Sequence, residues 1–295
     1  MTAVAVPDVD TSTGPWAAHR RRAEALRAHH AFAGEVLTLY LALLDVWTAA
    51  GDAARQQAPE PQALAGWAGE HVLPRVVEAT VEAGPELLAN ATRKLVEQGS
   101  AEKALPAWLS GAGDDLEPAE RYLARASLRA PLEALQAGAG ACARDPSPRG
   151  GRRCPSCGGP PQLSFRADAG DQLVSGGRSL LCARCGTSWS YSSSTCASCG
   201  ESDGGRRSIY AERREWPVVG HGDATAPRKT FGAPMPMFPH LRIEGCSNCN
   251  RYLIDVDLGH DARAVPEVDE LAALPLDLHA AELGLRKVTP NLMGF

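Results

Sequence analysis

The sequence predicts a multidomain α+β protein: an N-terminal all-α helical bundle, two small β modules with four cysteines each, and a short C-terminal helix. Three observations lead to this fold class. Apolar side chains recur at three- and four-residue steps through the first half, which is the spacing of one helix face. A linker rich in proline and glycine follows at residues 144–153. Beyond it, eight of the nine cysteines form four Cys-x-x-Cys pairs.

The first half is expected to be a bundle of amphipathic helices. A long helix is predicted from Trp16, with Gly51 placed to end it. Pro85 and Pro118 stand where first-turn prolines are tolerated, and Gly84 stands where a helix can stop. We interpret the apolar stripe as core, since such faces are normally buried, with a binding groove as the alternative. Further helices are expected over 64–81, 85–96, 101–109, 117–129 and 132–142.

The cysteine pairs predict two four-thiolate metal sites. A two-residue spacer lets one tight turn, or knuckle, aim two thiolates at one ion, and two knuckles complete a tetrahedron. The knuckles are separated by 24, 10 and 46 residues, and only the longer gaps leave room for a β-hairpin. Sequential pairing is therefore favoured, with interleaved pairing as the alternative. We define the first site as Cys154, Cys157, Cys182 and Cys185, and the second site as Cys196, Cys199, Cys246 and Cys249.

The residue after each knuckle supports this interpretation. It is Gly158, Gly186, Gly200 or Asn250, and glycine and asparagine adopt a left-handed backbone at least cost. This is the knuckle of rubredoxins and zinc ribbons. Disulfides and redox dithiols are the alternatives, but no secretory leader and no βαβ pattern accompany the cysteines. Iron and zinc both suit four thiolates, so the ligand set leaves the metal open.

Charge and motifs limit the function classes. The net charge is −5, and residues 144–260 hold 15 Lys and Arg against 11 Asp and Glu. Metallated thiolates would bring that region near neutral, so nucleic acid is not expected as a partner. A zinc-ribbon nucleic-acid-binding protein remains the alternative function. An enzyme is not expected, because no catalytic triad or nucleotide motif is present and four protein ligands leave a metal no open position. None of the histidines lies at knuckle spacing.

Several segments have two interpretations. Arg149, Arg152 and Arg153 in the linker are either solvated surface or a docking patch for a partner. We interpret Trp189 and Tyr191 as side chains that cover a metal site and exclude water from it. Stacking on nucleic-acid bases is the alternative. We expect the apolar segment 231–239 to pack over the second ribbon, with binding to a partner as the alternative. Cys142 is expected to be a small buried side chain without a role.

The chain is expected to be cytoplasmic without membrane insertion. Residues 1–15 lack the pattern of a signal peptide, and the apolar stretch 36–44 is too short to span a bilayer. A helical segment over 268–283 is expected to dock back on the core. The expected domains are a helical domain at 1–143, a linker at 144–153, rubredoxin-like ribbons at 154–194 and 195–260, and a helical tail at 261–295.

The segment from Cys154 to Val256 resembles the FdhE family of formate dehydrogenase accessory proteins. The phrases that carry the resemblance are CPSCGGPP, LLCARCGTSWSY, CASCGE and GCSNCNRYLIDVD. The resemblance implies a cytoplasmic maturation factor with two iron ions in rubredoxin-like sites, zinc being compatible with the same ligands. It also implies a partner, the catalytic subunit of a respiratory formate dehydrogenase before export. The stretch between Cys199 and Cys246 is longer than in the family pattern.

Overall fold

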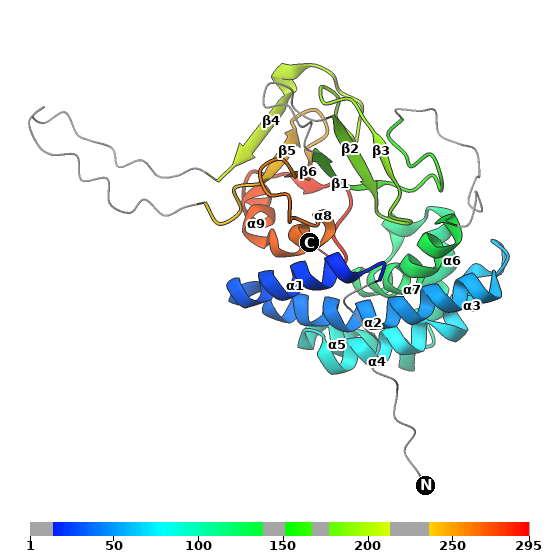
Figure 1. The fold of residues 1–295 in the computed structure, drawn as a ribbon. Coiled ribbons are helices and arrows are strands. Elements are labelled where there is room, and N and C mark those ends of the chain that lie inside the picture. The colour runs from blue at the N-terminus through cyan, green and yellow to red at the C-terminus, as the bar shows by residue number, and fades with distance from the viewer. Residues whose placement is uncertain (1–13, 138–150, 167–176, 213–235, 295) are drawn as a thin grey trace, which may run out of the picture.

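The computed structural model describes residues 14–137, 151–166, 177–212 and 236–294 (Figure 1). A layer of helices from the first half lies against one side of a twisted sheet, and the two C-terminal helices lie between them (Figure 1). The predicted fold class, a helical bundle followed by four-cysteine β modules and C-terminal helices, is confirmed. The bundle helices are α1 (Ala17–His29), α2 (Gly34–Gln57), α3 (Leu64–His71), α4 (Leu73–Ala83), α5 (Glu86–Glu97), α6 (Ala104–Ser110) and α7 (Pro118–Ala137).

The bundle is built around α2, and here two predicted helix limits were wrong. The expected single helix from Trp16 is interrupted at His30, whose φ of −124° and ψ of 88° are not helical. After that, α2 continues through Gly51 to Gln57. Gly51 is buried against α7, where a Cβ would lie 3.9 Å from the Ala130 carbonyl oxygen. A Cβ there would make only ordinary contact, so Gly51 is a buried residue within α2 and does not end the helix. The runs expected on either side of Pro131 form the single helix α7.

By length and composition alone, the helical stretch Ala31–Gln57 is sufficient to cross a membrane. The core helix of a globular domain passes the same test. Here the stretch packs against α1, α4 and α7, and Leu37, Leu43 and Leu44 are fully enclosed by them. We therefore interpret α2 as the central helix of the bundle.

The two cysteine modules share one sheet. Each module is an antiparallel meander, β1–β2–β3 or β4–β5–β6, and the meanders join through a parallel pair between β1 and β6. The strand order is β3-β2-β1-β6-β5-β4, with β7 beside β6. The expected domain limits stay predictions. The strands are β1 (Pro161–Arg166), β2 (Arg178–Cys182), β3 (Ser188–Ser190), β4 (Arg207–Ala211), β5 (Leu241–Cys246), β6 (Arg251–Asp257) and β7 (Arg286–Lys287).

A buried charge network lies where the two meanders meet. Asp255 of β6 is fully buried and accepts hydrogen bonds from Ser164 Oγ at 2.6 Å, Arg166 Nε at 3.0 Å and Arg242 Nε at 2.8 Å. Arg166 also reaches Glu244 Oε1 at 2.8 Å. Because each buried carboxylate meets several guanidinium groups, its desolvation is compensated.

The C-terminal tail closes the molecule. It forms α8 (Pro266–Ala272) and α9 (Leu274–Glu282), so the expected helix over 268–283 is two short helices with Pro275 in the first turn of the second. Arg22 of α1 holds Asp269 of α8 with its Nε at 3.0 Å from Oδ2. Arg125 of α7 donates to the Asn291 carbonyl oxygen at 3.0 Å. These contacts fix the helical bundle to the end of the chain.

Candidate metal centres

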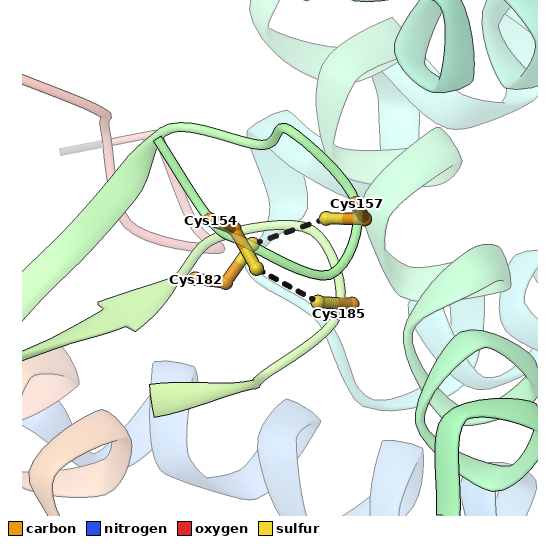
Figure 2. Close-up of side chains that lie close together, drawn as sticks. All are labelled: Cys154, Cys157, Cys182 and Cys185. Atoms are coloured by element: carbon orange, nitrogen blue, oxygen red, sulfur yellow. Dashed lines mark hydrogen bonds between the residues drawn. The ribbon is translucent and has the colours of Figure 1, made fainter. Parts of the chain in front are cut away.

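The four sulfur atoms of the first site converge. Cys154 and Cys157 come from the turn before β1, while Cys182 ends β2 and Cys185 lies in the turn to β3. Figure 2 shows the four side chains pointing toward one another. Sulfur–sulfur distances are 3.7 Å for Cys154 to Cys185 and 3.5 Å for Cys157 to Cys182.

The second site repeats this arrangement at the other meander. Cys196 and Cys199 precede β4, while Cys246 ends β5 and Cys249 lies in the turn to β6. The sulfur–sulfur distance is 3.9 Å for Cys196 to Cys249 and 3.8 Å for Cys199 to Cys246. Within each site all ligand atoms lie within 4.8 Å of one another. The structure thus brings the cysteines together in sequential groups and not in interleaved ones.

These distances suit a tetrahedral metal site. Metal–sulfur bonds of about 2.3 Å give a tetrahedron with edges of about 3.8 Å, which matches the separations in both sites. A disulfide would require sulfurs about 2.05 Å apart, and the eight cysteines of the two sites are free thiols. The two tetracysteine clusters could therefore hold one ion each, and the donor set fits iron or zinc.

The knuckle backbones follow the sequence prediction. Gly158, Gly186, Gly200 and Asn250 have φ values of 68°, 70°, 84° and 52°, so the expected left-handed residue after each knuckle is confirmed. The N–H of Gly158 donates to the Cys154 carbonyl oxygen at 2.9 Å, and the Gly186 and Gly200 N–H groups make the equivalent bonds. Each of these three turns closes on itself, which fixes the direction of its two thiols.

Hydrogen-bond donors surround the sulfurs. The backbone N–H groups of Gly159 and Arg184 donate to Cys157 and Cys182 Sγ, each at 3.4 Å. At the second site the Asn248 side-chain amide donates to Cys199 Sγ at 3.6 Å. Such donors stabilise thiolates over thiols. Gly159 also makes room, because a Cβ there would lie 2.8 Å from Cys182 Sγ.

Without an ion, the thiols of a site share protons. Hydrogen bonds with Cys157 and Cys182 lower the pKa of Cys154 to about 7, whereas the hydrogen bond with Cys154 raises the pKa of Cys157. Burial raises the pKa of Cys182 well above its usual value. Four adjacent thiols cannot all ionise without a cation, so metal binding must displace protons and weaken in acid.

The remaining candidate residues are placed as follows. Arg149 and Cys142 lie outside the described residues, as do residues 213–235 of the long stretch between the second-site knuckles. Arg152 and Arg153 are exposed, and Arg152 Nη1 donates to the Ser198 carbonyl oxygen of the second site at 2.7 Å.

Trp189, Tyr191 and Phe238 are buried, whereas Met237 of the apolar segment is 48% exposed. Trp189 donates from Nε1 to the Gly151 carbonyl oxygen at 2.9 Å, and Tyr191 donates from its hydroxyl to the Cys196 carbonyl oxygen at 3.0 Å. Their burial agrees with the interpretation as covers and leaves neither ring free to stack on a base. Phe238 packs on His30, with ring centroids 4.8 Å apart.

Sequence reasoning missed the contacts that attach the first site to the helical bundle. Arg184, between the two cysteines of its knuckle, lies over the Trp108 ring of α6, with its Cζ 5.8 Å from the ring centroid. The signal was present, because Arg184 is the only charged residue inside any of the four knuckles. The residue type alone does not indicate a buried contact, because arginine is usually exposed.

Fold and sites together define a class of protein: a helical domain joined to a β-sheet that carries two tetracysteine clusters. The family description "FdhE, C-terminal domain" matches residues 236–293. Proteins called FdhE homologs from Aquifex aeolicus and Pseudomonas aeruginosa are each 31% identical to this chain, over 142 and 140 residues. The resemblance to FdhE is thereby confirmed.

The extent of these matches is uneven. The sequence alignments cover 48% of this chain and 41% and 38% of the two relatives, so the chain aligns with about two fifths of their length. The crystal structure of the FdhE protein from Pseudomonas aeruginosa aligns over 94% of both chains, with a TM-score of 0.61 at 23% identity. That match shows that the fold is shared along nearly the whole chain.

Proposed function

We propose that this protein is a maturation factor for formate dehydrogenase that acts in the cytoplasm. In this proposal it binds the apo catalytic subunit of a respiratory formate dehydrogenase and carries one metal ion on each tetracysteine site. The observation that carries the proposal is the pair of four-sulfur clusters with tetrahedral spacing, set in an FdhE fold. The name of the relatives supports the choice of enzyme system.

The metal ligands in this proposal are the eight paired cysteines. The resemblance to FdhE favours iron as the metal, and zinc is compatible with the same ligands. A bound iron would supply one-electron chemistry, whereas zinc would be purely structural. In either case four protein ligands leave the ion no open position, so we propose an accessory protein and not an enzyme. The sulfur geometry contributes tetrahedral coordination and the knuckle N–H groups partly neutralise the thiolate charge.

The first test is metal content. We expect two ions per chain in protein purified from its native cytoplasm, because both clusters have the same geometry. Elemental analysis gives the number, and visible absorption identifies ferric thiolate sites, since zinc sites are colourless. One ion or none after reconstitution with ferrous iron or zinc would contradict the proposal.

The second test concerns the partner. Arg152 and Arg153 are exposed beside the second site, and we propose that they, with Arg149, contact the apo-enzyme. Reversing Arg152 and Arg153 to Glu should weaken co-purification of the catalytic subunit. The loss should be larger at low salt than at high, because added salt shortens the reach of exposed charges, to about 8 Å at physiological ionic strength.

A matched control is available on α5. Arg93 and Lys94 form an adjacent, exposed cation pair in the helical bundle, and reversing them to Glu should leave co-purification unchanged. Equal loss in both double variants would indicate a general effect of net charge and remove the linker from the interface. Tight, salt-sensitive binding of RNA or DNA by the wild-type chain would instead favour the zinc-ribbon alternative.

A further inference from the structure

The two sites differ in their access to solvent. In the first site Cys154 and Cys182 are fully buried and Cys185 is 1% exposed, which leaves only Cys157 partly open. The second site has two partly exposed cysteines, Cys199 and Cys249. A chelating molecule could therefore approach an ion in the second site while the first stayed closed.

Arg184 holds the first site closed from within. Its backbone N–H donates to Cys182 Sγ at 3.4 Å, and its Nη1 donates to the Cys157 carbonyl oxygen at 3.0 Å. One residue thereby links the two knuckles that together supply the four ligands. Opening the site by separating the knuckles would break a charged hydrogen bond in a buried place, since Arg184 is 8% exposed.

The same side chain fastens the site to the helical bundle. Trp108 of α6 is stacked by two guanidinium groups, with Arg184 Cζ 5.8 Å and Arg125 Cζ 5.5 Å from the ring centroid. Neither Trp108 Nε1 nor Arg184 Nε has a hydrogen-bond acceptor within the described part of the chain. The contact therefore rests on cation–π stacking and on the exclusion of water.

A second contact seats the same knuckle against α7. Gly186 lies so close to Arg129 that a Cβ would be 2.4 Å from its Nη1. Arg129 is itself held by Glu267 of α8, with Nη2 2.8 Å from Oε2. The knuckle of Cys182 and Cys185 is thus enclosed by α6, α7 and the C-terminal tail.

We propose that Arg184 acts as a latch: it holds the two knuckles of the first site together and makes the ion there kinetically inert. The ion of the second site exchanges readily with ions and chelators in solution. This rests on the proposed function in one respect, that both sites bind metal. The protein would then carry one permanent ion that ties the sheet to the helical bundle and one replaceable ion at its surface. Arg184 is a positioning residue, because it holds the ligands without coordinating the metal.

The chain offers a matched substitution. The second knuckle reads Cys182-Ala183-Arg184-Cys185 and the third reads Cys196-Ala197-Ser198-Cys199, so they differ only at the third position. Arg184→Ser gives the second knuckle the sequence of the third, which already forms the same turn in this protein. Ser198→Ala removes the side chain at the equivalent place in the second site and serves as the control.

The experiment follows zinc release from the full chain. Protein loaded with two zinc ions is mixed with an excess of a chromogenic chelator, 4-(2-pyridylazo)resorcinol, and absorbance is recorded over time. Wild type should release its ions in two phases of equal amplitude. Arg184→Ser should accelerate the slow phase about tenfold or more, the effect of losing one hydrogen bond to a charged group. The fast phase should not change, and Ser198→Ala should leave the slow phase unchanged.

A second variant protects the test against misfolding. Trp108→Phe keeps an aromatic ring but weakens the cation–π contact, and it should accelerate the slow phase by a smaller factor. A single release phase in wild type would overturn the proposal, as would an unchanged slow phase in both Arg184→Ser and Trp108→Phe. A chain that cannot be loaded with two zinc ions would overturn the proposed metal sites themselves, a result distinct from failure of the latch.

Discussion

Replacing Asp255 with alanine is expected to destabilise the fold by about 3–5 kcal/mol, the usual effect of removing one partner from a buried ion pair. The carboxylate is fully buried and holds both Arg166 and Arg242. Its removal takes the Nε acceptor from both guanidinium groups and the acceptor of the Ser164 hydroxyl, and leaves Arg166 with Glu244 and Arg242 with the more distant Asp257. The free energy of unfolding, measured in urea, checks the expectation.

Asp257 is the matched control, because it lies two residues along the same strand. Its side chain is 39% exposed and its ion pair with Arg242 measures 4.0 Å. Exposed pairs of this kind contribute about 0–1 kcal/mol, so Asp257→Ala should be nearly neutral. Equal losses in the two variants would show that the network at the sheet junction does not stabilise the fold.

The buried Asp255 carboxylate should also make the stability of the fold sensitive to acid. Burial alone would raise the pKa of Asp255, but the Ser164 hydrogen bond and the Arg166 and Arg242 guanidinium groups outweigh it and lower that pKa. A group whose folded pKa lies below its unfolded value, about 3.9 for aspartate, stabilises the fold above that pH. Its contribution is lost as the pH falls through the folded pKa. Asp255→Ala should therefore flatten the acid side of the stability profile.

Replacing Cys157 or Cys199 with serine should remove one of the two metal ions in each case. Both are the second cysteine of the first knuckle in their site, and both are partly exposed, so they form a matched pair. Loss of a thiolate leaves three ligands and the repulsion that the metal had balanced. Elemental analysis of each purified variant should return one ion per chain.

The two cysteine variants should differ in where the protein loosens. The first site contacts α6 through Arg184 and Trp108, so Cys157→Ser should open protease sites at the junction of sheet and bundle. Cys199→Ser should open them only around the second site. In both variants the far-UV signal of the helices should persist, because α2 is enclosed by α1, α4 and α7 of the bundle itself. Two retained ions and unchanged protease resistance would contradict this expectation.

The local parts of the metal sites could be predicted from the sequence. The Cys-x-x-Cys turns and their left-handed Gly158 and Asn250 depend on a few neighbouring residues, and spacer lengths sufficed to favour the sequential grouping that the structure forms. Helix limits were less reliable. Gly51 has the sequence signature of a helix end, but α2 continues through it to Gln57 while packed on α7.

Long-range contacts could not be predicted in the same way. The parallel pairing of β1 with β6 joins strands from different modules, and nothing in either strand specifies its partner. The burial of the Arg184 side chain could not be predicted either, because a lone arginine in a turn is usually solvated. Its side chain is covered because Trp108 of α6, distant in the sequence, packs against it.

The parallel pairing of β1 with β6 also affects how the chain can be made. Ser164 and Asp255 are 91 residues apart, and a ribosome adding about 5–20 residues per second needs roughly 5 to 20 seconds to cover that interval. During that time all four first-site cysteines have been synthesised, but β1 has no neighbour on its β6 side. An unpaired strand edge can associate with other chains. The nascent protein is therefore exposed to aggregation through β1 until β6 has been synthesised and pairs with it.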